Sequence, residues 1–349
     1  MPMPDIVAAI IAFGVMIFCH ELGHFLVAKR VGVTVYAFAL GFGPRLLGFR
    51  AGETRYAINL LPLGGYVRMA GEDLDDAGGP GSFRSKTVWQ RMAVVAAGPG
   101  MNLLLALVLL TSMALAVGVP VGVSNRIGQL LPGWPAEQAG LRPGDAIVAI
   151  NDVPMRDGKE VVDTIHSHPD EDLVLTIRRD GRQFTVAVHS RREPEQKIGL
   201  IGFSPEPIRE HMGPVGAFLW GMRSTIQYVA VIVGAIVRLF RDGRFLEELG
   251  GPVAAVGFLG EAAQAGGEVF IYTAALFSIM IGIFNLLPIP ALDGGRLTFL
   301  VVEAFRRRPV DPKREGYIHL VGFAVLIMLL LILTGQDIMR ILSRIWARQ

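Results

Sequence analysis

The sequence predicts a polytopic α-helical membrane protein: four transmembrane helices, a membrane-reentrant β-hairpin and one inserted α+β domain. Its 349 residues are 52% hydrophobic and only 18% charged. The mean hydropathy is +0.46, which is too apolar for an ordinary soluble protein. Residues 6–28, 92–119, 269–292 and 316–336 are each apolar and long enough to cross a bilayer. Residues 123–204 lie between the second and third of these segments. They contain charged residues, strand-like stretches and frequent turns, which is typical of a soluble domain.

The first apolar segment, 6–28, contains His20-Glu21-Leu22-Gly23-His24, which is the pattern H-E-x-x-H. Side chains at positions i and i+4 share one face of a helix, so two imidazoles can bind one metal ion. Glu21 lies beside the first histidine, where a general base for a metal-activated water belongs. Ionisable residues inside an apolar span are costly and usually functional. We therefore interpret His20 and His24 as zinc ligands and Glu21 as the catalytic base.

Residues 33–67 predict a β-hairpin rather than a soluble fold. Val33–Leu40 and Arg55–Leu61 have strand-like sequences, the glycine-rich stretch Gly41–Gly52 separates them, and the apolar, turn-rich residues 60–67 follow. We expect this hairpin to dip into the membrane and form a wall of the active-site cavity, with a free edge for a substrate strand. The alternative is a cytoplasmic loop with partly buried strands.

Two further features lie before and within the second apolar segment, 92–119. The acidic cluster Glu72, Asp73, Asp75 and Asp76 before it is typical of a solvated turn. Within the segment, Gly98-Pro99-Gly100-Met101-Asn102 places small residues where helices can pack closely. Asn102 could line the metal site, or it could serve as a hydrogen bond between helices.

Residues 123–204 predict the inserted domain. The run Pro135–Asp152 resembles the P-A-x-x-A-G-L-x-x-G-D-x-I-x-x-I-N-G core of PDZ domains, with Asp152 in place of the final glycine. A short helix is expected over 161–166, and strands over 173–178 and 183–188 with an Asp180-Gly181 turn between them. PDZ domains bind extended peptides by strand addition. The alternative is a domain that only excludes bulky substrates.

Residues 205–266 predict amphipathic helices that lie on the outer membrane surface. Arg223 divides the apolar stretch 213–237 into two runs, each shorter than a membrane span. Gly250-Gly251-Pro252 then breaks the chain before a second short piece. No basic or aromatic-interleaved patch in the sequence indicates nucleic acid as a partner. The single cysteine, Cys19, excludes an intrachain disulfide.

The segment 269–292 leads directly into Asp293-Gly294-Gly295. Catalytic zinc commonly has three protein ligands. Asp293 is the best candidate for the third because it ends an apolar helix on the same side of the membrane as His20 and His24. The alternative is a simple helix-ending turn. Asn285 could donate a hydrogen bond to a developing oxyanion. Lys29 and Arg30 after the first span, and further basic residues after 305, place this side in the cytoplasm and both termini outside.

Together these motifs carry a family resemblance. H-E-x-x-H in the first span, N-x-x-P-x-x-x-x-D-G over 285–294 and a PDZ core between them resemble the site-2 protease family of intramembrane metalloproteases, in its bacterial regulator-of-sigma-E protease branch. The resemblance implies one zinc ion on His20, His24 and Asp293, Glu21 as base, and Asn285 assisting at the substrate carbonyl. It also implies a membrane-reentrant hairpin in 33–67. One PDZ domain is recognisable here, where larger members have two.

The expected function is therefore intramembrane cleavage of single-span membrane proteins that have already been trimmed outside the membrane. The resemblance implies anti-sigma factors and signal-peptide remnants as substrates. It also implies a multi-pass protein of the bacterial inner membrane, with the PDZ domain on the periplasmic side and the active site toward the cytoplasm. Two alternatives stay open at this point: a zinc-binding membrane transporter, which would more naturally show repeated halves, and a non-catalytic PDZ scaffold, which would not need Glu21.

Overall fold

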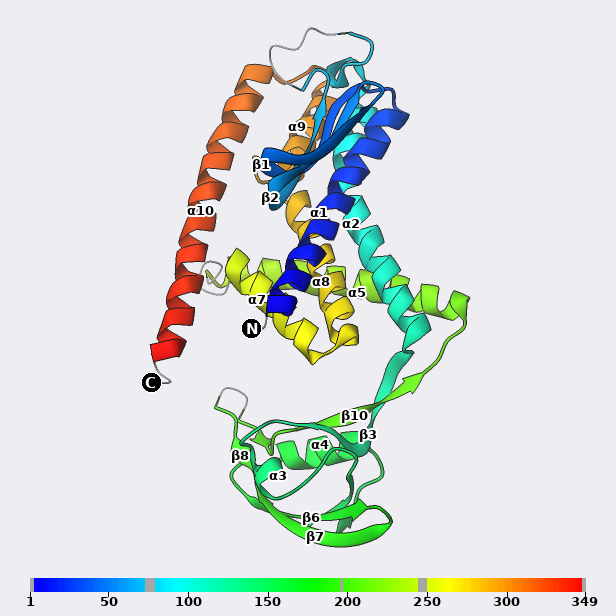
Figure 1. The fold of residues 1–349 in the computed structure, drawn as a ribbon, viewed down its shortest axis with the longest axis vertical. Helices are drawn as coiled ribbons and strands as arrows, with labels where there is room; N and C mark the ends of the chain where they lie inside the picture. The colour runs from blue at the N-terminus through cyan, green and yellow to red at the C-terminus, as the bar shows by residue number, and fades with distance from the viewer. Residues whose placement is uncertain (1–2, 73–78, 195–196, 244–249, 347–349) are drawn as a thin grey trace. The chain divides into compact units, whose positions relative to one another are not determined.

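The computed structural model describes residues 3–72, 79–194, 197–243 and 250–346 (Figure 1). The chain divides into two compact units. The helical unit comprises Met1–Met113 and Val215–Gln349, and the strand-rich unit comprises Ala114–Pro214. The predicted acidic residues Asp73, Asp75 and Asp76 lie outside the described residues.

Five helices of the described chain are long and apolar enough to cross a membrane: α1 (Met3–Arg30), α2 (Val88–Ala116), α5 (Pro214–Arg241), α8 (Gly267–Leu286) and α10 (Pro312–Trp346). Four of them match the segments predicted as spans: α1 and α10 contain all of 6–28 and 316–336, whereas α2 and α8 end before the predicted ends of 92–119 and 269–292. The fifth, α5, contains the stretch that was expected to lie on the membrane surface. In Figure 1, α5 runs crosswise to α1, α2 and α10. A helix that crosses the lipid interior must be about 20 residues long and mostly apolar, and these helices meet both conditions. They fit a multi-pass membrane protein.

Small side chains let the helices of this unit pack closely. Ala9 and Met16 of α1 contact Leu259 of α7 (Pro252–Ala265) and Ala274 of α8 in one buried cluster. A second cluster joins α2, α5 and α8 through Ala106, Leu110, Ile236, Ala275, Ile279 and Ile283. Close approach of helix backbones is the usual source of stability between membrane helices, because lipid offers no hydrophobic driving force for their association.

The helix predicted over 269–292 ends earlier in the structure. α8 stops at Leu286, and Leu287 is extended with φ −63° and ψ 143°. The cause is Pro288, since a residue before proline avoids the helical conformation. After this break, α9 (Asp293–Arg306) begins at the predicted third ligand. The apolar composition runs on through the break, so composition alone overestimates the length of the helix.

Polar contacts attach α10 to the rest of the helical unit near both of its ends. His319 Nδ1 accepts a hydrogen bond from the Ala291 amide at 2.8 Å, within the irregular backbone after α8. Farther along, the Asp337 carboxylate accepts from the amides of Gly251 (3.3 Å) and Ala254 (2.8 Å) at the start of α7. Apart from such contacts, most α10 side chains are exposed, as expected for a helix that faces lipid.

The predicted hairpin is present as β1 (Val35–Ala51) and β2 (Thr54–Met69), but its strands are longer than predicted. Residues 41–52 were expected to separate two strands, whereas β1 continues through most of them. Gly41 and Gly43 have φ of +82° and +86° and lie where the pairing register shifts. Glycine adopts this backbone conformation without strain, so the strand bends at these glycines instead of ending.

Because both strands bend, each pairs with more than one part of the other. Residues 37–40 pair with 65–68 on one side and with 55–58 on the other, and 47–51 pair with 54–58. One face of the hairpin packs against α1 and the start of α2 through Ala28, Val33, Val35, Phe38, Val67, Met69 and Val94. Large apolar side chains on β1 and β2 remain exposed, among them Phe42, Leu46, Leu47, Phe49, Leu60 and Leu61. An exposed apolar surface of this kind fits contact with lipid or with a partner.

The strand-rich unit is built on an antiparallel sheet with strand order β10-β3-β4-β6-β7, and β5 pairs with β4. Its strands and helices are β3 (Val119–Leu130), α3 (Pro135–Gln138), β4 (Ala146–Ile150), β5 (Val153–Pro154), α4 (Gly158–His166), β6 (Asp172–Arg179), β7 (Arg182–His189), β8 (Arg191–Arg192), β9 (Gly199–Leu200) and β10 (Phe203–Glu210). The helix and the two strands predicted within 161–188 lie inside α4, β6 and β7.

The turns of this unit form where the sequence predicts them. Asp180 and Gly181 join β6 to β7 with φ of 51° and 79°. Asn151 and Asp152 join β4 to β5 with φ of 49° and 62°, so Asp152 adopts the left-handed conformation that the replaced glycine would favour. The buried face of the sheet holds Ile127, Ile147, Ile150, Leu173, Leu175 and Ile177.

Candidate metal centre

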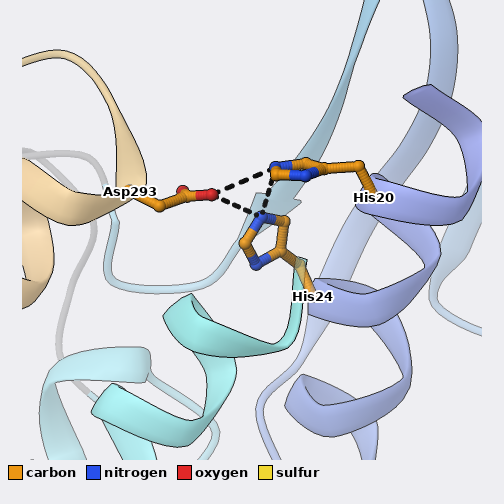
Figure 2. Close-up of side chains that lie close together, drawn as sticks. All are labelled: His20, His24 and Asp293. Atoms are coloured by element: carbon orange, nitrogen blue, oxygen red, sulfur yellow. Dashed lines mark hydrogen bonds and ion pairs between the residues drawn. The ribbon is translucent and has the colours of Figure 1, made fainter. Parts of the chain in front are cut away.

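Two of the three predicted ligands come from one turn of α1. His20 and His24 are both buried, with 8% of each residue exposed. Their Nε2 atoms lie 3.2 Å apart, because the i, i+4 spacing places both imidazoles on the same face of the helix (Figure 2). The local sequence is therefore sufficient to form this half of the site.

The third predicted ligand approaches from the first turn of α9. The Oδ2 atom of Asp293 lies 3.0 Å from His20 Nε2 and 3.3 Å from His24 Nε2 (Figure 2). Among the described residues, these three form the one group of histidine, cysteine or acidic side chains close enough to hold a metal ion. Sequence reasoning named the same three.

The distances fit zinc. Ligand atoms about 2.0 Å from a common tetrahedral centre lie roughly 3.3 Å from one another, close to the observed 3.0 Å, 3.2 Å and 3.3 Å. Asp293 Oδ2 is buried and makes no hydrogen bond of good geometry, although both imidazoles are near. The two Nε2 atoms lie within hydrogen-bond distance of each other, but Asp293 Oδ2 has no such partner, and a bound cation would satisfy all three atoms.

A glycine of α2 provides room beside the histidines. Gly98 is buried, and a Cβ atom there would overlap His24 Nε2 and lie 2.9 Å from His20 Nε2. Gly23 of α1 packs in turn against the Ala97 backbone, so α1 and α2 approach closely at this level. The small residues that the sequence analysis assigned to helix packing therefore also make space at the metal centre.

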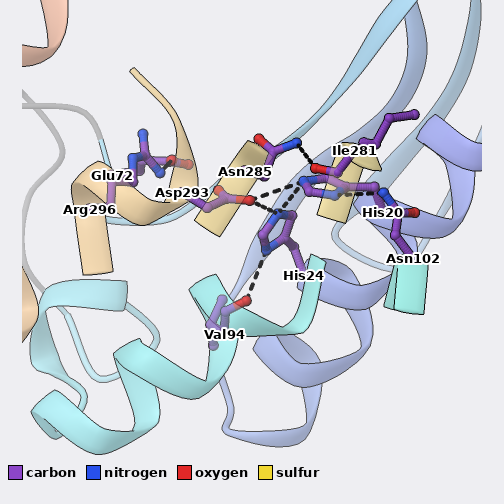
Figure 3. Close-up of polar contacts among 9 residues, drawn as sticks. All are labelled: His20, His24, Glu72, Val94, Asn102, Ile281, Asn285, Asp293 and Arg296. Carbon is purple, nitrogen blue, oxygen red and sulfur yellow. Dashed lines mark hydrogen bonds and ion pairs between the residues drawn. The ribbon is translucent and has the colours of Figure 1, made fainter. Parts of the chain in front are cut away.

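Further contacts from α2 orient the imidazoles. His24 Nδ1 donates to the Val94 carbonyl oxygen at 2.9 Å, which leaves Nε2 with a lone pair for a metal. The Asn102 side chain lies 3.4 Å from His20 Nδ1 (Figure 3). Sequence reasoning left Asn102 with two possible roles and did not find Val94, because a backbone carbonyl carries no signal in the sequence.

The proposed base, Glu21, is partly buried between α1 and the hairpin. A Cβ atom at Gly65 of β2 would lie 2.8 Å from Glu21 Cγ, so the hairpin packs directly over the carboxylate-bearing side chain. The backbone near Gly65 therefore lies next to Glu21.

Asn285 lies near the end of α8, in the surroundings of the three ligands (Figure 3). Its Nδ2 donates to the Ile281 carbonyl oxygen of the same helix at 3.0 Å. A role toward a substrate oxyanion would therefore require the side chain to exchange this bond for one to the substrate.

Glu72 differs from the solvated acidic residue that the sequence predicts. It pairs with Arg296, which lies one helical turn after Asp293 on α9 (Figure 3). The pair joins the segment after β2 to the helix that carries the third ligand. The spacing of Asp293 and Arg296 was visible in the sequence, but the partner of the arginine was not. Both residues also line a cavity of about 670 Å³, to which residues of α2, α9 and α10 contribute.

Comparisons with known proteins identify the family to which the chain belongs. The model of peptidase family M50 matches residues 8–329. The zinc metalloprotease RasP of Geobacillus kaustophilus is 34% identical, over 97% of this chain and 98% of its own. The regulator of sigma-W protease RasP of Bacillus subtilis is 32% identical, over 96% and 98%. A putative zinc metalloprotease of Clostridium acetobutylicum is 34% identical, over 96% and 97%.

Among solved structures, the PDZ domain of an SdrC-like protein from Listeria monocytogenes aligns with 26% of this chain and 93% of its own, at 18% identity and a TM-score of 0.22. The family match, by contrast, covers nearly all of the chain and includes every residue of the candidate metal centre. The chain belongs to peptidase family M50, the site-2-type zinc metalloproteases.

Proposed function

We propose that this protein is an intramembrane zinc endopeptidase that cleaves the transmembrane segments of single-span proteins. His20, His24 and Asp293 hold one zinc ion, and Glu21 is the catalytic base. The observation that carries the proposal is the convergence of two imidazoles and one carboxylate, from the distant helices α1 and α9, at mutual distances of 3.0–3.3 Å inside an apolar helical unit.

Zinc held there would polarise a peptide carbonyl and lower the pKa of a water molecule toward neutrality. Glu21 would accept a proton from the attacking water and pass it to the leaving amine. The hydrogen bond to Val94 keeps the His24 ring oriented throughout. Asn285 assists at the substrate carbonyl once its amide leaves the Ile281 oxygen.

The hairpin presents the substrate. A transmembrane helix hides its carbonyl groups in its own hydrogen bonds, so it must unwind before hydrolysis. In the sheet, residues 65–67 pair with 38–40. An extended substrate strand would add to this hairpin near Gly65, which lies beside Glu21. The hairpin thus acts as a reentrant wall of the active site.

The membrane arrangement that we propose has four spans, α1, α2, α8 and α10, in the bacterial inner membrane. α5 lies on the outer surface, which is supported by its crosswise course in Figure 1 and by Arg223 within it. Lys29 and Arg30 at the end of α1 mark the cytoplasmic side, toward which the metal centre lies. Both termini and the strand-rich unit are then periplasmic.

The substrates that we propose are trimmed membrane proteins, anti-sigma factors and signal-peptide remnants. The name of the Bacillus subtilis relative supports the first class. The strand-rich unit acts as a PDZ domain that selects them. A cavity of about 200 Å³ between α4 and residues 200–205 suits an apolar side chain of an extended peptide. If this unit selects by size instead, deleting 123–204 should admit untrimmed substrates.

The decisive experiment compares wild type with Glu21→Gln on a panel of single-span substrates in lipid vesicles. We expect the substitution to lower cleavage by about 10²- to 10⁴-fold, because the base is lost, while zinc content stays unchanged. Undiminished cleavage would refute the role of Glu21. Zinc binding without cleavage of any trimmed substrate would favour the transporter or scaffold alternatives.

A further inference from the structure

One buried side chain beside the metal centre has an unsatisfied atom. Asn102 of α2 is fully buried. Its Nδ2 lies 3.4 Å from His20 Nδ1, and its Oδ1 has no hydrogen-bond partner (Figure 3). An unpaired buried carbonyl costs about 1–3 kcal/mol. In this arrangement the Oδ1 atom of Asn102 therefore costs stability and makes no hydrogen bond in return.

The contacts of His20 depend on which of its two ring nitrogens carries the proton. With its proton on Nε2, the ring can donate toward Asp293, whose Oδ2 is 3.0 Å away. Nδ1 then carries the lone pair and accepts from the Asn102 amide nitrogen. A zinc ligand must instead present the Nε2 lone pair, and its proton must move to Nδ1, which then needs an acceptor.

A carboxamide can meet both needs, because its nitrogen donates and its oxygen accepts. We infer that Asn102 is a positioning residue for His20 that hydrogen-bonds either tautomer: the nitrogen faces Nδ1 without metal, and the oxygen faces it once zinc is bound. The amide turns about its Cβ–Cγ bond between the two states, and the unpartnered Oδ1 becomes the acceptor. This inference rests on the proposed zinc site.

The two histidines differ in this respect. His24 Nδ1 faces the Val94 carbonyl, which can only accept, so its tautomer is fixed in advance for metal binding. His20 is the ligand whose proton must relocate. The backbone of Asn102 is held meanwhile, since Ser278 of α8 donates to its carbonyl oxygen at 2.8 Å. Rotation of the side-chain amide is thus the change that the structure allows at this position.

The test measures zinc affinity of the full-length protein in detergent by chelator competition. Asn102→Leu, nearly the same shape without donor or acceptor, should weaken zinc binding about 10- to 100-fold, as loss of such a partner does in other zinc sites. Asn102→Asp, which accepts from Nδ1–H, should keep affinity at or above the wild-type value. Thr225→Val is the matched control, because it removes a buried hydroxyl on α5 and should leave affinity unchanged.

A second measurement follows the proton itself. Nitrogen-15 NMR of histidine-labelled protein should show His20 protonated at Nδ1 with zinc and at Nε2 without it. Unchanged zinc affinity in Asn102→Leu, or a zinc-loaded His20 without a proton on Nδ1, would overturn the inference while leaving the protease proposal intact. Failure of the wild type to bind zinc would overturn both.

Discussion

Two carboxylates, Asp145 in the strand-rich unit and Asp293 in the helical unit, are held in opposite ways. In the strand-rich unit, Asp145 is 2% exposed and accepts hydrogen bonds from Arg179 Nε and Nη2, both at 2.7 Å, and from the Arg142 amide at 2.8 Å. In the helical unit, Asp293 faces two imidazoles, and its Oδ2 makes no well-formed hydrogen bond. Burial of charge alone does not mark a functional site, whereas converging unsatisfied donor atoms do.

This difference predicts how each unit responds to substitution. Changes around Asp293 should alter zinc binding and cleavage with little effect on folding. Changes around Asp145 should alter the stability of the strand-rich unit and leave zinc binding unaffected. The predictions below test this separation, starting with the largest expected effect.

Gly98→Ala should abolish zinc binding. The added methyl group would overlap His24 Nε2 and crowd His20 Nε2, where the ligand atoms converge. We expect zinc affinity, measured by chelator competition, to fall by at least about a hundredfold, the upper end for substitutions beside a zinc site, and cleavage to fall with it.

Gly100→Ala is the matched control for that substitution. It directly follows Pro99 in α2, and outside the adjoining backbone of its own helix no described atom lies within 4 Å of the Cβ position. Alanine stabilises a helix by up to about 1 kcal/mol relative to glycine, so affinity and cleavage should stay at the wild-type level. Equal zinc affinity in both variants would contradict the assigned position of the metal.

Asp145→Asn should destabilise the strand-rich unit by about 2 kcal/mol, since it removes a buried, charge-assisted pair with Arg179. Hydrogen exchange of the core amides around Ile147, in the full-length protein at pH 7, measures this effect. Zinc affinity should not change. Asp163→Asn, which breaks an exposed pair with Lys159, is the control and should leave the exchange of the core amides unchanged.

The same pair sets a pH dependence. Burial alone would raise the pKa of the Asp145 carboxyl, but hydrogen bonds from Arg179 and the Arg142 amide hold this pKa below its usual value. A carboxyl whose pKa is lower when folded stabilises the fold above its unfolded pKa, about 3.9. Protection of the strand-rich core should therefore fall as the pH drops below about 4, and Asp145→Asn should weaken that dependence. An identical pH profile would refute this assignment.

The smallest effect is expected at Glu72 and Arg296. Their ion pair is partly exposed, with 23% and 43% of the side chains accessible, so its coupling should be at most about 1 kcal/mol. Glu72→Gln and Arg296→Gln should each lower cleavage up to about fivefold, and the double variant should be no worse than either. Additive losses would show that the two residues act independently of each other.

The sequence was sufficient for those parts of the site that depend on local geometry. His20 and His24 meet because of helix periodicity, and the turns at Asp152 and Asp180 follow from residues that tolerate positive φ. Asp293 was predicted as the third ligand because it is an ionisable residue directly after an apolar helix, on the same side of the membrane as the histidines. The structure brings these three side chains together.

Other features depend on how α2 and α9 lie against their neighbours, which no local pattern encodes. The contacts of Val94, Gly98 and Asn102 with the histidines need one particular register between α1 and α2. The partner of Arg296, Glu72, comes from the segment that follows β2. The extent of β1 was also missed, because glycines that usually end strands here bend one instead.

The central claim is that two distant helices hold one zinc ion between them. The most direct test is the zinc content and zinc affinity of the full-length protein and of Asp293→Ala. The account predicts one zinc ion per wild-type chain, and an affinity that falls by at least about a hundredfold without the carboxylate. Wild-type zinc affinity in Asp293→Ala would contradict it.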